Sequence, residues 1–303
     1  PIYRSMIEFT GATPVPIPIQ EGYGFAFSAE ETLSLITPRT RLIILNSPAN
    51  PTGGVVPKEE FDKLVAGLQA WPDVAILSDE IYDRILYDGE KHITMLSYPE
   101  IRDRLIILNG WSKTYAMTGW RLGYAIWPGK LFDLARKLAV NFHSCVNAPT
   151  QYAGIAALKG PQDCVDMMNA EFDKRRKLVV AGLNSLPGVS CILPKGAFYA
   201  FPNVSGTGWK AKKLASAILD DVGVAMVGGP DFGILGEAAS HLDGVAGRDA
   251  GDLLLPGGRV GHVVVEALGA IAAEAAVEPV IGAEEVEDGR HVALAIGEPD
   301  ASR

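Results

Sequence analysis

The sequence predicts an α/β protein whose mostly parallel sheet is covered by helices on both faces, followed by a smaller α+β unit. Two observations predict this fold. Short, continuous apolar runs alternate with helical patterns in the first half of the chain, as in sheets buried on both faces. Later the pattern changes to two short extended runs, a helix and one more strand. We expect a large unit over residues 1–165 and a small unit over residues 166–237.

The elements of the large unit follow in order. Four apolar runs are expected strands: residues 41–46 (RLIILN), 73–79 (DVAILSD), 104–110 (RLIILNG) and 122–127 (LGYAIW). Residues 57–71 are an expected helix, because Pro57 stands at its start and its apolar residues have helical spacing. Two long helical regions are expected over about residues 129–159 and 161–186.

The small unit is expected to begin with a change of pattern. Residues 189–202 (VSCILPKGAFYAFP) are typical of two strands around Lys195 and Gly196. A helix over about residues 210–221 and a short strand over residues 222–227 should follow.

The last residues, 238–303, differ in composition from the rest. They contain no Lys, Asn, Gln, Phe, Trp, Tyr, Cys, Met or Thr, although all nine types occur earlier. One interpretation is a low-complexity, partly disordered tail. The other is a GC-rich gene read in a different frame after about residue 237. The chain also begins without Met, and we expect its natural N-terminus to precede Pro1.

Composition excludes several classes of function. The formal net charge is −9 and basic residues form no run, which argues against nucleic-acid or anionic-membrane partners. No apolar stretch has the roughly 18 residues of a spanning helix. Three dispersed cysteines, Cys145, Cys164 and Cys191, favour small core residues over disulfides or zinc, and a cytoplasmic location is expected. The five histidines lack metal-ligand spacing, so no metal is expected.

Three loops that follow three of the expected strands carry the candidate site. In an open parallel sheet, ligands bind beyond the carboxyl ends of the strands, so these loops should meet at one crevice. The candidate residues are Asn50, Asp79, Tyr82, Ser112, Lys113 and Arg121.

Each of these residues has an ordinary interpretation when it is taken alone. Asp79 fits a helix N-cap, with Tyr82 on the same face of that helix, and Asn50 fits a turn. Lys113 fits a solvated surface lysine. Their joint placement favours chemistry, because Ser112 and Arg121 offer a hydroxyl donor and a bidentate fork for a phosphate. A lysine beside such a grip can act as an amine nucleophile.

Three motifs, NSPANPTGG, SDEIYDRILYDG and GWSKTYAMTGWRLGY, together resemble those of the class I/II aminotransferases, the fold-type-I enzymes that use pyridoxal 5′-phosphate (PLP). The similarity runs from about residue 2 to residue 237. It implies transfer of an amino group between an L-amino acid and a 2-oxo acid, and a homodimer. Competing motifs, such as a Walker A loop or G-x-S-x-G, are absent from the sequence.

The resemblance implies a role for each candidate residue. Lys113 would be the lysine that forms the Schiff base with PLP and shuttles a proton. Asp79 would keep the pyridine nitrogen protonated. Tyr82 and Asn50 would bind the 3′-oxygen of the cofactor, and Ser112 and Arg121 would hold its phosphate.

The sequence also departs from the family pattern. The family's Gly-containing phosphate loop and ring-stacking aromatic residue precede the PIY position, where this chain begins. The family's arginine for the substrate carboxylate follows a GEGY-like stretch, but this chain reads GEAASHLDG there. A truncated, catalytically inactive remnant that binds PLP weakly or not at all is therefore the alternative function.

Overall fold

The computed structural model describes residues 2–232 and 240–241, which form two compact units. The larger unit comprises Ile2–Asp173 together with Pro194–Phe198, and the smaller one comprises Lys174–Leu193 and the described residues from Tyr199 onward. The boundary expected near residue 165 lies within one helix, α6 (Asp163–Asn184). A single continuous helix therefore contributes residues to both units.

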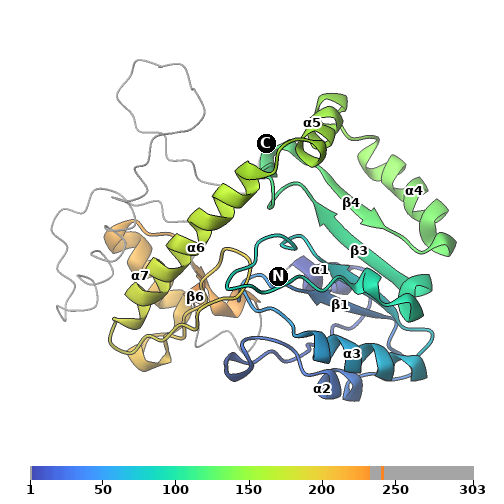
Figure 1. Cartoon of the computed structure of the whole chain (residues 1–303). Coiled ribbons are helices and arrows are strands. Elements are labelled where there is room, and N and C mark those ends of the chain that lie inside the picture. Colours follow the sequence, from blue (N-terminus) through green and yellow to red (C-terminus); the bar gives the residue numbers. More distant parts are fainter. Residues whose placement is uncertain (1, 233–239, 242–303) are drawn as a thin grey trace. The chain divides into compact units, whose positions relative to one another are not determined.

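The larger unit contains a four-stranded sheet in the order β1-β2-β3-β4 (Figure 1). The strands are β1 (Leu42–Asn46), β2 (Ala75–Asp79), β3 (Leu105–Gly110) and β4 (Gly123–Ile126). The first three are parallel, and β4 pairs antiparallel with β3. This confirms the mostly parallel sheet. The final pair is antiparallel because the loop between β3 and β4 holds no crossover helix to carry the chain back along the sheet.

Helices α1 (Ile2–Phe9), α2 (Ala29–Ser34) and α3 (Lys58–Gly67) belong to the larger unit. The helical region expected over residues 129–159 is two helices, α4 (Gly129–His143) and α5 (Ala148–Lys159). Ser144 ends α4 with a φ of 61°, and the Asn147 side chain accepts a hydrogen bond from the Thr150 amide at the start of α5. A side-chain cap restarts the helix, which apolar spacing alone does not reveal.

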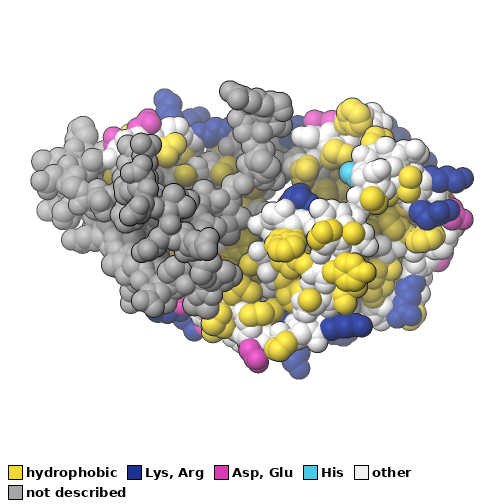
Figure 2. Space-filling view, turned by 90° about the horizontal axis from the view of Figure 1, so that it is seen from above, with side chains coloured by type: hydrophobic (Ala, Val, Ile, Leu, Met, Phe, Trp, Pro, Cys, Tyr) yellow, Lys and Arg dark blue, Asp and Glu magenta, His cyan; other side chains and the backbone are white. Residues whose placement is uncertain are grey.

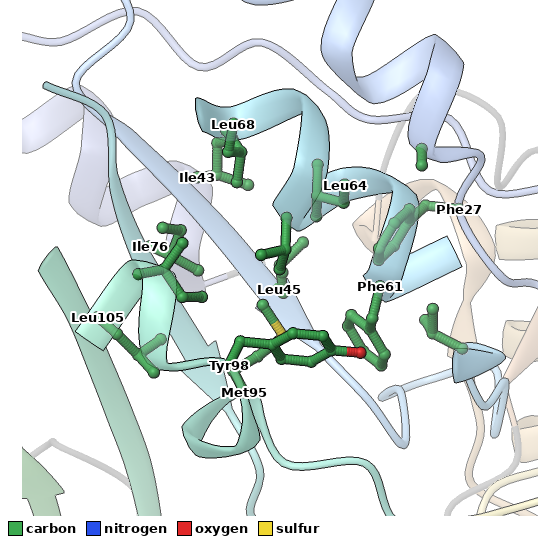
Figure 3. Close-up of a cluster of buried hydrophobic side chains, with 14 of the residues drawn as sticks. Phe27, Ile43, Leu45, Phe61, Leu64, Leu68, Ile76, Met95, Tyr98 and Leu105 are labelled. Atoms are coloured by element: carbon green, nitrogen blue, oxygen red, sulfur yellow. The ribbon is translucent and has the colours of Figure 1, made fainter. Parts of the chain in front are cut away.

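The core of the larger unit lies where α2 and α3 pack on the parallel strands (Figure 3). Phe61, Leu64 and Leu68, from the apolar face predicted for α3 and the turn after it, are buried here. Phe27 and Phe61 meet edge to face, with ring centroids 5.8 Å apart. Packing in this core therefore fixes the sheet, and the candidate residues lie at or after the ends of its strands.

Replacing Leu64 by Ala should lower the free energy of unfolding by about 2–5 kcal/mol. Leu64 is 0% exposed, so the substitution leaves a cavity between α3 and the sheet. Urea denaturation followed by circular dichroism measures the change. The matched control is Leu134→Ala on α4, where the side chain is 59% exposed and a change within about 0.5 kcal/mol is expected. Equal losses at both positions would contradict this account of the core.

The smaller unit differs from its expectation in two places. The two strands expected over residues 189–202 are wrong: the structure has isolated bridges there, Ser190 with Asn203 and Gly196 with Leu86, and residues 194–198 belong to the larger unit. The strand expected over residues 222–227 is also wrong, because α7 (Ala211–Val222) ends at Gly223, whose φ is 70°. Only β5 (Val227–Gly228) is a strand there, and it pairs antiparallel with β6 (Ser240–His241). The expected helix over residues 210–221 is confirmed as α7.

A small core of the second unit surrounds Cys191. Cys191 packs with Val180 and Ala200, and Asn184 exchanges two hydrogen bonds with the Cys191 backbone, at 2.9 and 2.7 Å. The other two cysteines, Cys145 and Cys164, are exposed, so their expected place in a core is wrong. The tail prediction for residues 238–303 lies outside the described residues, apart from Ser240 and His241.

Hydrophobic side chains are also exposed in the larger unit, and Figure 2 shows many of them on one face of the molecule. Helix α4 has no buried residue. Its exposed large apolar side chains are Phe132, Leu134, Leu138, Val140 and Phe142. No helix in the described part of the chain is long and apolar enough to cross a membrane.

Candidate active site

The carboxyl ends of β1 and β2 meet at one pair of residues. Asn46 and Asp79 are partners in the parallel register, and Asn46 Nδ2 donates to the Asp79 carbonyl at 3.0 Å. Asn46 Oδ1 accepts the amide of Asn50 at 2.8 Å. The loop that carries Asn50 is thus tied to the strand that carries Asp79. Sequence reasoning missed Asn46, although a polar residue that closes an apolar strand was a usable signal.

The Asp79 carboxylate is held on both of its oxygens. Tyr3 donates its hydroxyl to Oδ2 at 2.5 Å, and the amide of Ile81 donates to Oδ1 at 3.3 Å. Burial raises the pKa of Asp79 above its ordinary value, and the negative charge of Glu80 raises it further. The hydrogen bonds and the charge of Lys113 oppose this shift. Asp79 is therefore a carboxyl group with a raised pKa beside a lysine.

The neighbouring carboxyl group, Glu80, lies in a different environment. Burial alone would raise its pKa, but hydrogen bonds from His92, the Met95 amide and Thr94 together hold the pKa below its ordinary value. His92 Nε2 lies 2.8 Å from Oε2, and the Met95 amide donates to Oε1 at 2.9 Å. Glu80 is thus a structural anion whose charge acts on Asp79.

Tyr3 is a residue of this site that sequence reasoning missed. It lies on α1, 76 residues before Asp79 in the chain. Burial and the nearby Asp79 carboxylate raise the pKa of Tyr3, which keeps its hydroxyl protonated and able to donate. Nothing in the first residues indicates such a partner, because the contact depends on how α1 packs.

The Lys113 amine lies beside a pair of aromatic rings. Its Nζ is 6.0 Å from the ring centroid of Tyr82 and 5.6 Å from that of Phe198, and the two rings meet edge to face. The helix that Asp79 would cap under its ordinary interpretation does not form, because residues 81–84 form turns. The Ile81 amide bonds back to the Asp79 side chain two residues earlier, which favours a turn over a helix N-terminus.

Phe198 reaches the lysine because residues 194–198 fold back onto the larger unit. Tyr87 donates its hydroxyl to the Ala197 carbonyl at 2.5 Å, and the Ala197 amide donates to the Ile85 carbonyl at 2.9 Å. An ion pair of 2.6 Å joins Lys195 Nζ to Glu90. Sequence reasoning missed Phe198, since its pattern indicated only a strand.

The loop after β1, which carries Asn50 and Gly53, also packs closely against residues 194–198. A Cβ atom built on Gly53 would lie 2.3 Å from Pro194 Cβ and 2.8 Å from the Gly196 carbonyl oxygen. Gly53 also has a φ of 66°, where side chains cause strain. Position 53 therefore requires glycine for two independent reasons.

The other predicted residues lie on the same loops. Ser112 directly precedes Lys113 and is partly buried, whereas Asn50 is exposed. Arg121 is exposed, has a φ of 55° and donates to the Thr118 carbonyl at 2.9 Å. The structure thus brings Asp79, Tyr82 and Lys113 together. The phosphate grip of Ser112 and Arg121 stays a prediction.

Replacing Tyr3 by Phe should destabilise the protein by about 1–3 kcal/mol at pH 7, because a donor to a charged group is lost. Without this hydrogen bond the pKa of Asp79 should rise further. The loss should shrink at pH values low enough to protonate Asp79 in both proteins, since only the charged form gains from the bond. Urea unfolding at several pH values measures this.

The control is Tyr23→Phe, because the Tyr23 side chain is 73% exposed. This variant should unfold like the wild type at every pH. A Tyr3→Phe loss that is the same at all pH values would contradict the assigned role of the hydroxyl.

Comparison with known proteins identifies the family. The sequence model described as "Aminotransferase class I and II" matches residues 1–242. An aspartate aminotransferase of Pyrococcus horikoshii is 39% identical over 237 residues, and an aromatic-amino-acid aminotransferase 2 of Thermococcus litoralis is 36% identical. Each match covers 78% of this chain and 60% of the relative, so the chain spans about 60% of the length of these relatives.

Solved structures of aminotransferases are also similar to this chain. An aromatic aminotransferase from Pyrococcus horikoshii superposes with a TM-score of 0.76 at 36% identity, over 80% of this chain and 65% of that one. The aspartate aminotransferase of Rhizobium meliloti gives a TM-score of 0.75 at 33% identity, over 89% and 67%. The parallel sheet, the loops at its strand ends and the extent of these matches have one explanation: the chain belongs to the class I and II aminotransferases, with their fold-type-I architecture.

Proposed function

We propose that this protein is a PLP-dependent aminotransferase that moves an amino group between an L-amino acid and a 2-oxo acid, with Lys113 as its Schiff-base lysine. One observation carries the proposal: the Lys113 amine lies 6.0 Å from the ring centroid of Tyr82, three residues after the Asp79 that ends β2. Two segments far apart in the sequence thus supply the three groups: residues 79–82 supply the carboxyl group and the phenol, and Lys113 supplies the amine.

The residues present fit the chemistry of PLP. Asp79 offers an anion to a protonated ring nitrogen, and a raised pKa is the mark of a carboxyl group placed in an apolar setting. Tyr82 and Asn50 would hold the ring's 3′-oxygen. Ser112 and Arg121 would hold the phosphate, as a hydroxyl donor and a fork of guanidinium donors.

When bound, PLP supplies an electron sink for the electrons of the Cα–H bond of an amino acid. The rest of the chemistry falls to the chain. Lys113 Nζ would hold the cofactor and would also take the proton from the Cα of the amino acid. Asp79 would keep a proton on the ring nitrogen. The aromatic rings of Tyr82 and Phe198 flank the amine and reduce its contact with water.

The names of the relatives support a choice of substrates to test. Those with the most similar sequences include aspartate and aromatic-amino-acid aminotransferases, so L-aspartate and L-tyrosine are the first donors to test, with 2-oxoglutarate as acceptor. We also propose a cytoplasmic homodimer, as the family resemblance implies.

The test is a titration of the purified chain with PLP, followed by absorbance in the near-visible and then by addition of each donor. The proposal expects a band that depends on Lys113 and shifts when a donor is added, together with release of the matching 2-oxo acid. A chain that gives no such band would refute the proposal.

A second candidate is a protein that holds PLP but does not transfer amino groups. The observation that favours it is in the sequence, which reads GEAASHLDG where the family resemblance implies an arginine for the substrate carboxylate. A Lys113-dependent band without 2-oxo acid from any donor would select this candidate.

A further inference from the structure

The segment that carries Tyr82 and the segment that carries Lys113 lie side by side in matched register. Three contacts join them, each between residues 31 apart in the sequence: Tyr82 with Lys113, Asp83 with Thr114, and Arg84 with Tyr115. The last two are hydrogen bonds of 3.4 and 3.5 Å. Successive residues of one segment thus face successive residues of the other. We call these three contacts the clamp.

Asp83 forms the centre of the clamp. Its Oδ1 accepts the Thr114 hydroxyl, and its Oδ2 accepts Asn109 Nδ2 at 2.9 Å. Asn109 belongs to β3, and its own Oδ1 accepts the Gly110 amide at 2.7 Å. Thr114 is buried. One carboxylate therefore ties the turn after β2 both to the strand β3 and to the residue that follows Lys113.

The outer contact of the clamp is anchored to a helix. Gln162 Oε1 accepts hydrogen bonds from Arg84 at 2.5 Å and from the Tyr115 hydroxyl at 3.2 Å. Its Nε2 donates to the carbonyls of Ala157 and Gly160, both at 2.9 Å. The end of α5 thus closes the clamp on its solvent side.

The loop that bears Lys113 needs such support. Residues 111–116 are bends and turns rather than helix or strand. Trp111 is tied to Leu122 and Gly154, but the backbone hydrogen bonds donated after Lys113 are local, from the Tyr115 amide to Trp111 and from the Ala116 amide to Lys113. A lysine side chain is long and flexible, so a fixed amine requires a fixed backbone and a packed neighbour.

We propose that Asp83 and Thr114 are positioning residues, whose hydrogen bond holds the Lys113 amine against Tyr82. Neither residue needs to touch the cofactor or substrate. The role assigned to Lys113 rests on the proposed function, whereas the order that the clamp imposes on residues 111–116 does not. The clamp therefore has a readout that needs no cofactor.

The experiment compares Thr114→Val with Thr114→Ser in the full chain. Valine keeps the shape of threonine but removes the hydroxyl, and serine keeps the hydroxyl. Without PLP, hydrogen exchange at the amides of Tyr115 and Ala116 should be about fivefold to tenfold faster in the valine variant, as expected for the loss of one buried hydrogen bond. The serine variant should exchange within about twofold of the wild type.

With PLP, the apparent dissociation constant from the Lys113-dependent band should rise about fivefold to tenfold in the valine variant and recover in the serine variant. Unchanged exchange and unchanged binding would overturn the proposal. Faster exchange with unchanged binding would also overturn it, because the contact would then be structural only. If the wild type gives no band, the proposed function fails, and the exchange comparison alone decides whether the clamp orders the loop.

Asp83 offers a second pair of variants in case Thr114→Val does not fold. Asp83→Asn keeps an oxygen for Asn109 and an amide that can donate to the Thr114 hydroxyl oxygen, whereas Asp83→Ala loses both contacts. The proposal expects faster amide exchange and weaker PLP binding in Asp83→Ala than in the wild type. In Asp83→Asn, both the exchange rate and the binding should be close to those of the wild type. Equal behaviour of the two variants would overturn it.

Discussion

Replacing Lys113 by Ala is expected to abolish the near-visible band that PLP gives with the wild-type chain and to lower any amino-transfer rate by at least about 10³-fold. The amine is both the covalent attachment point and the proton carrier of the proposed function, and general acid–base catalysis alone contributes about 10²–10⁴-fold. Absorbance after PLP titration and release of the 2-oxo acid measure the two effects.

Two further variants separate the amine from its charge. Lys113→Arg keeps a positive charge near Asp79, whose pKa the lysine lowers, but arginine cannot serve as the amine nucleophile. The Lys113→Arg variant should therefore lack the near-visible band, as Lys113→Ala does. Lys91→Ala, at an exposed position, should keep both the band and the rate. A band that persists in Lys113→Ala would remove Lys113 from the mechanism.

Replacing Asp79 by Asn should have opposite effects on rate and on stability. The rate of amino transfer should fall by about 10²–10³-fold, the loss typical when one fixed electrostatic partner is removed from an active site. The cofactor-free protein should unfold within about 1 kcal/mol of the wild type at pH 7, or be more stable, because an amide costs less to bury than a carboxylate. Steady-state kinetics and urea unfolding measure the two.

The effect of Asp79→Asn on stability should depend on pH with a definite sign. The pKa of Asp79 is raised from 3.8, so the folded state binds more protons than the unfolded state just above that pH. This contribution to wild-type stability is present at low pH and falls as the pH rises from 3.8 to the folded pKa. Asparagine does not titrate, so the free energy of unfolding of Asp79→Asn should rise relative to that of the wild type as the pH increases through that range.

Asp73→Asn is the control for Asp79→Asn. Asp73 is exposed, so the same loss of a carboxylate there should change neither the rate nor the stability curve. If Asp79→Asn destabilises the cofactor-free protein by several kcal/mol, the carboxylate is structural, and its assignment to a cofactor nitrogen loses its support.

The sequence by itself predicted the parallel strands and the loops that follow them. Its apolar runs are long and continuous, which is typical of parallel strands in sheets that helices cover, and such a pattern is visible without an alignment. Parallel strands place their carboxyl ends at one edge, so Asp79 and the loop of Asn50 were expected to meet. The pair Asn46 and Asp79 in the register of β1 and β2 confirms this expectation.

Prediction from sequence patterns failed where a segment contacts a distant part of the chain instead of its sequence neighbours. Residues 189–202 have strand-like composition, but Gly196 pairs with Leu86, 110 residues earlier, and not with a neighbouring strand. The ordinary interpretation of Asp79 was the cap of a helix after β2. The Asp79 carboxylate instead binds Tyr3 and the Ile81 amide, and the chain turns.

Only the tertiary structure decided the surroundings of the lysine. Tyr3, Phe198 and the contact of Asp83 with Thr114 each join residues 31 or more apart in the chain, and their local sequences carry no mark of the partner. The chemistry-bearing residues could be found from the sequence because their positions follow from strand ends. The residues that orient them could not, because a hydrogen bond between two loops depends on how the packed core sets those loops against each other.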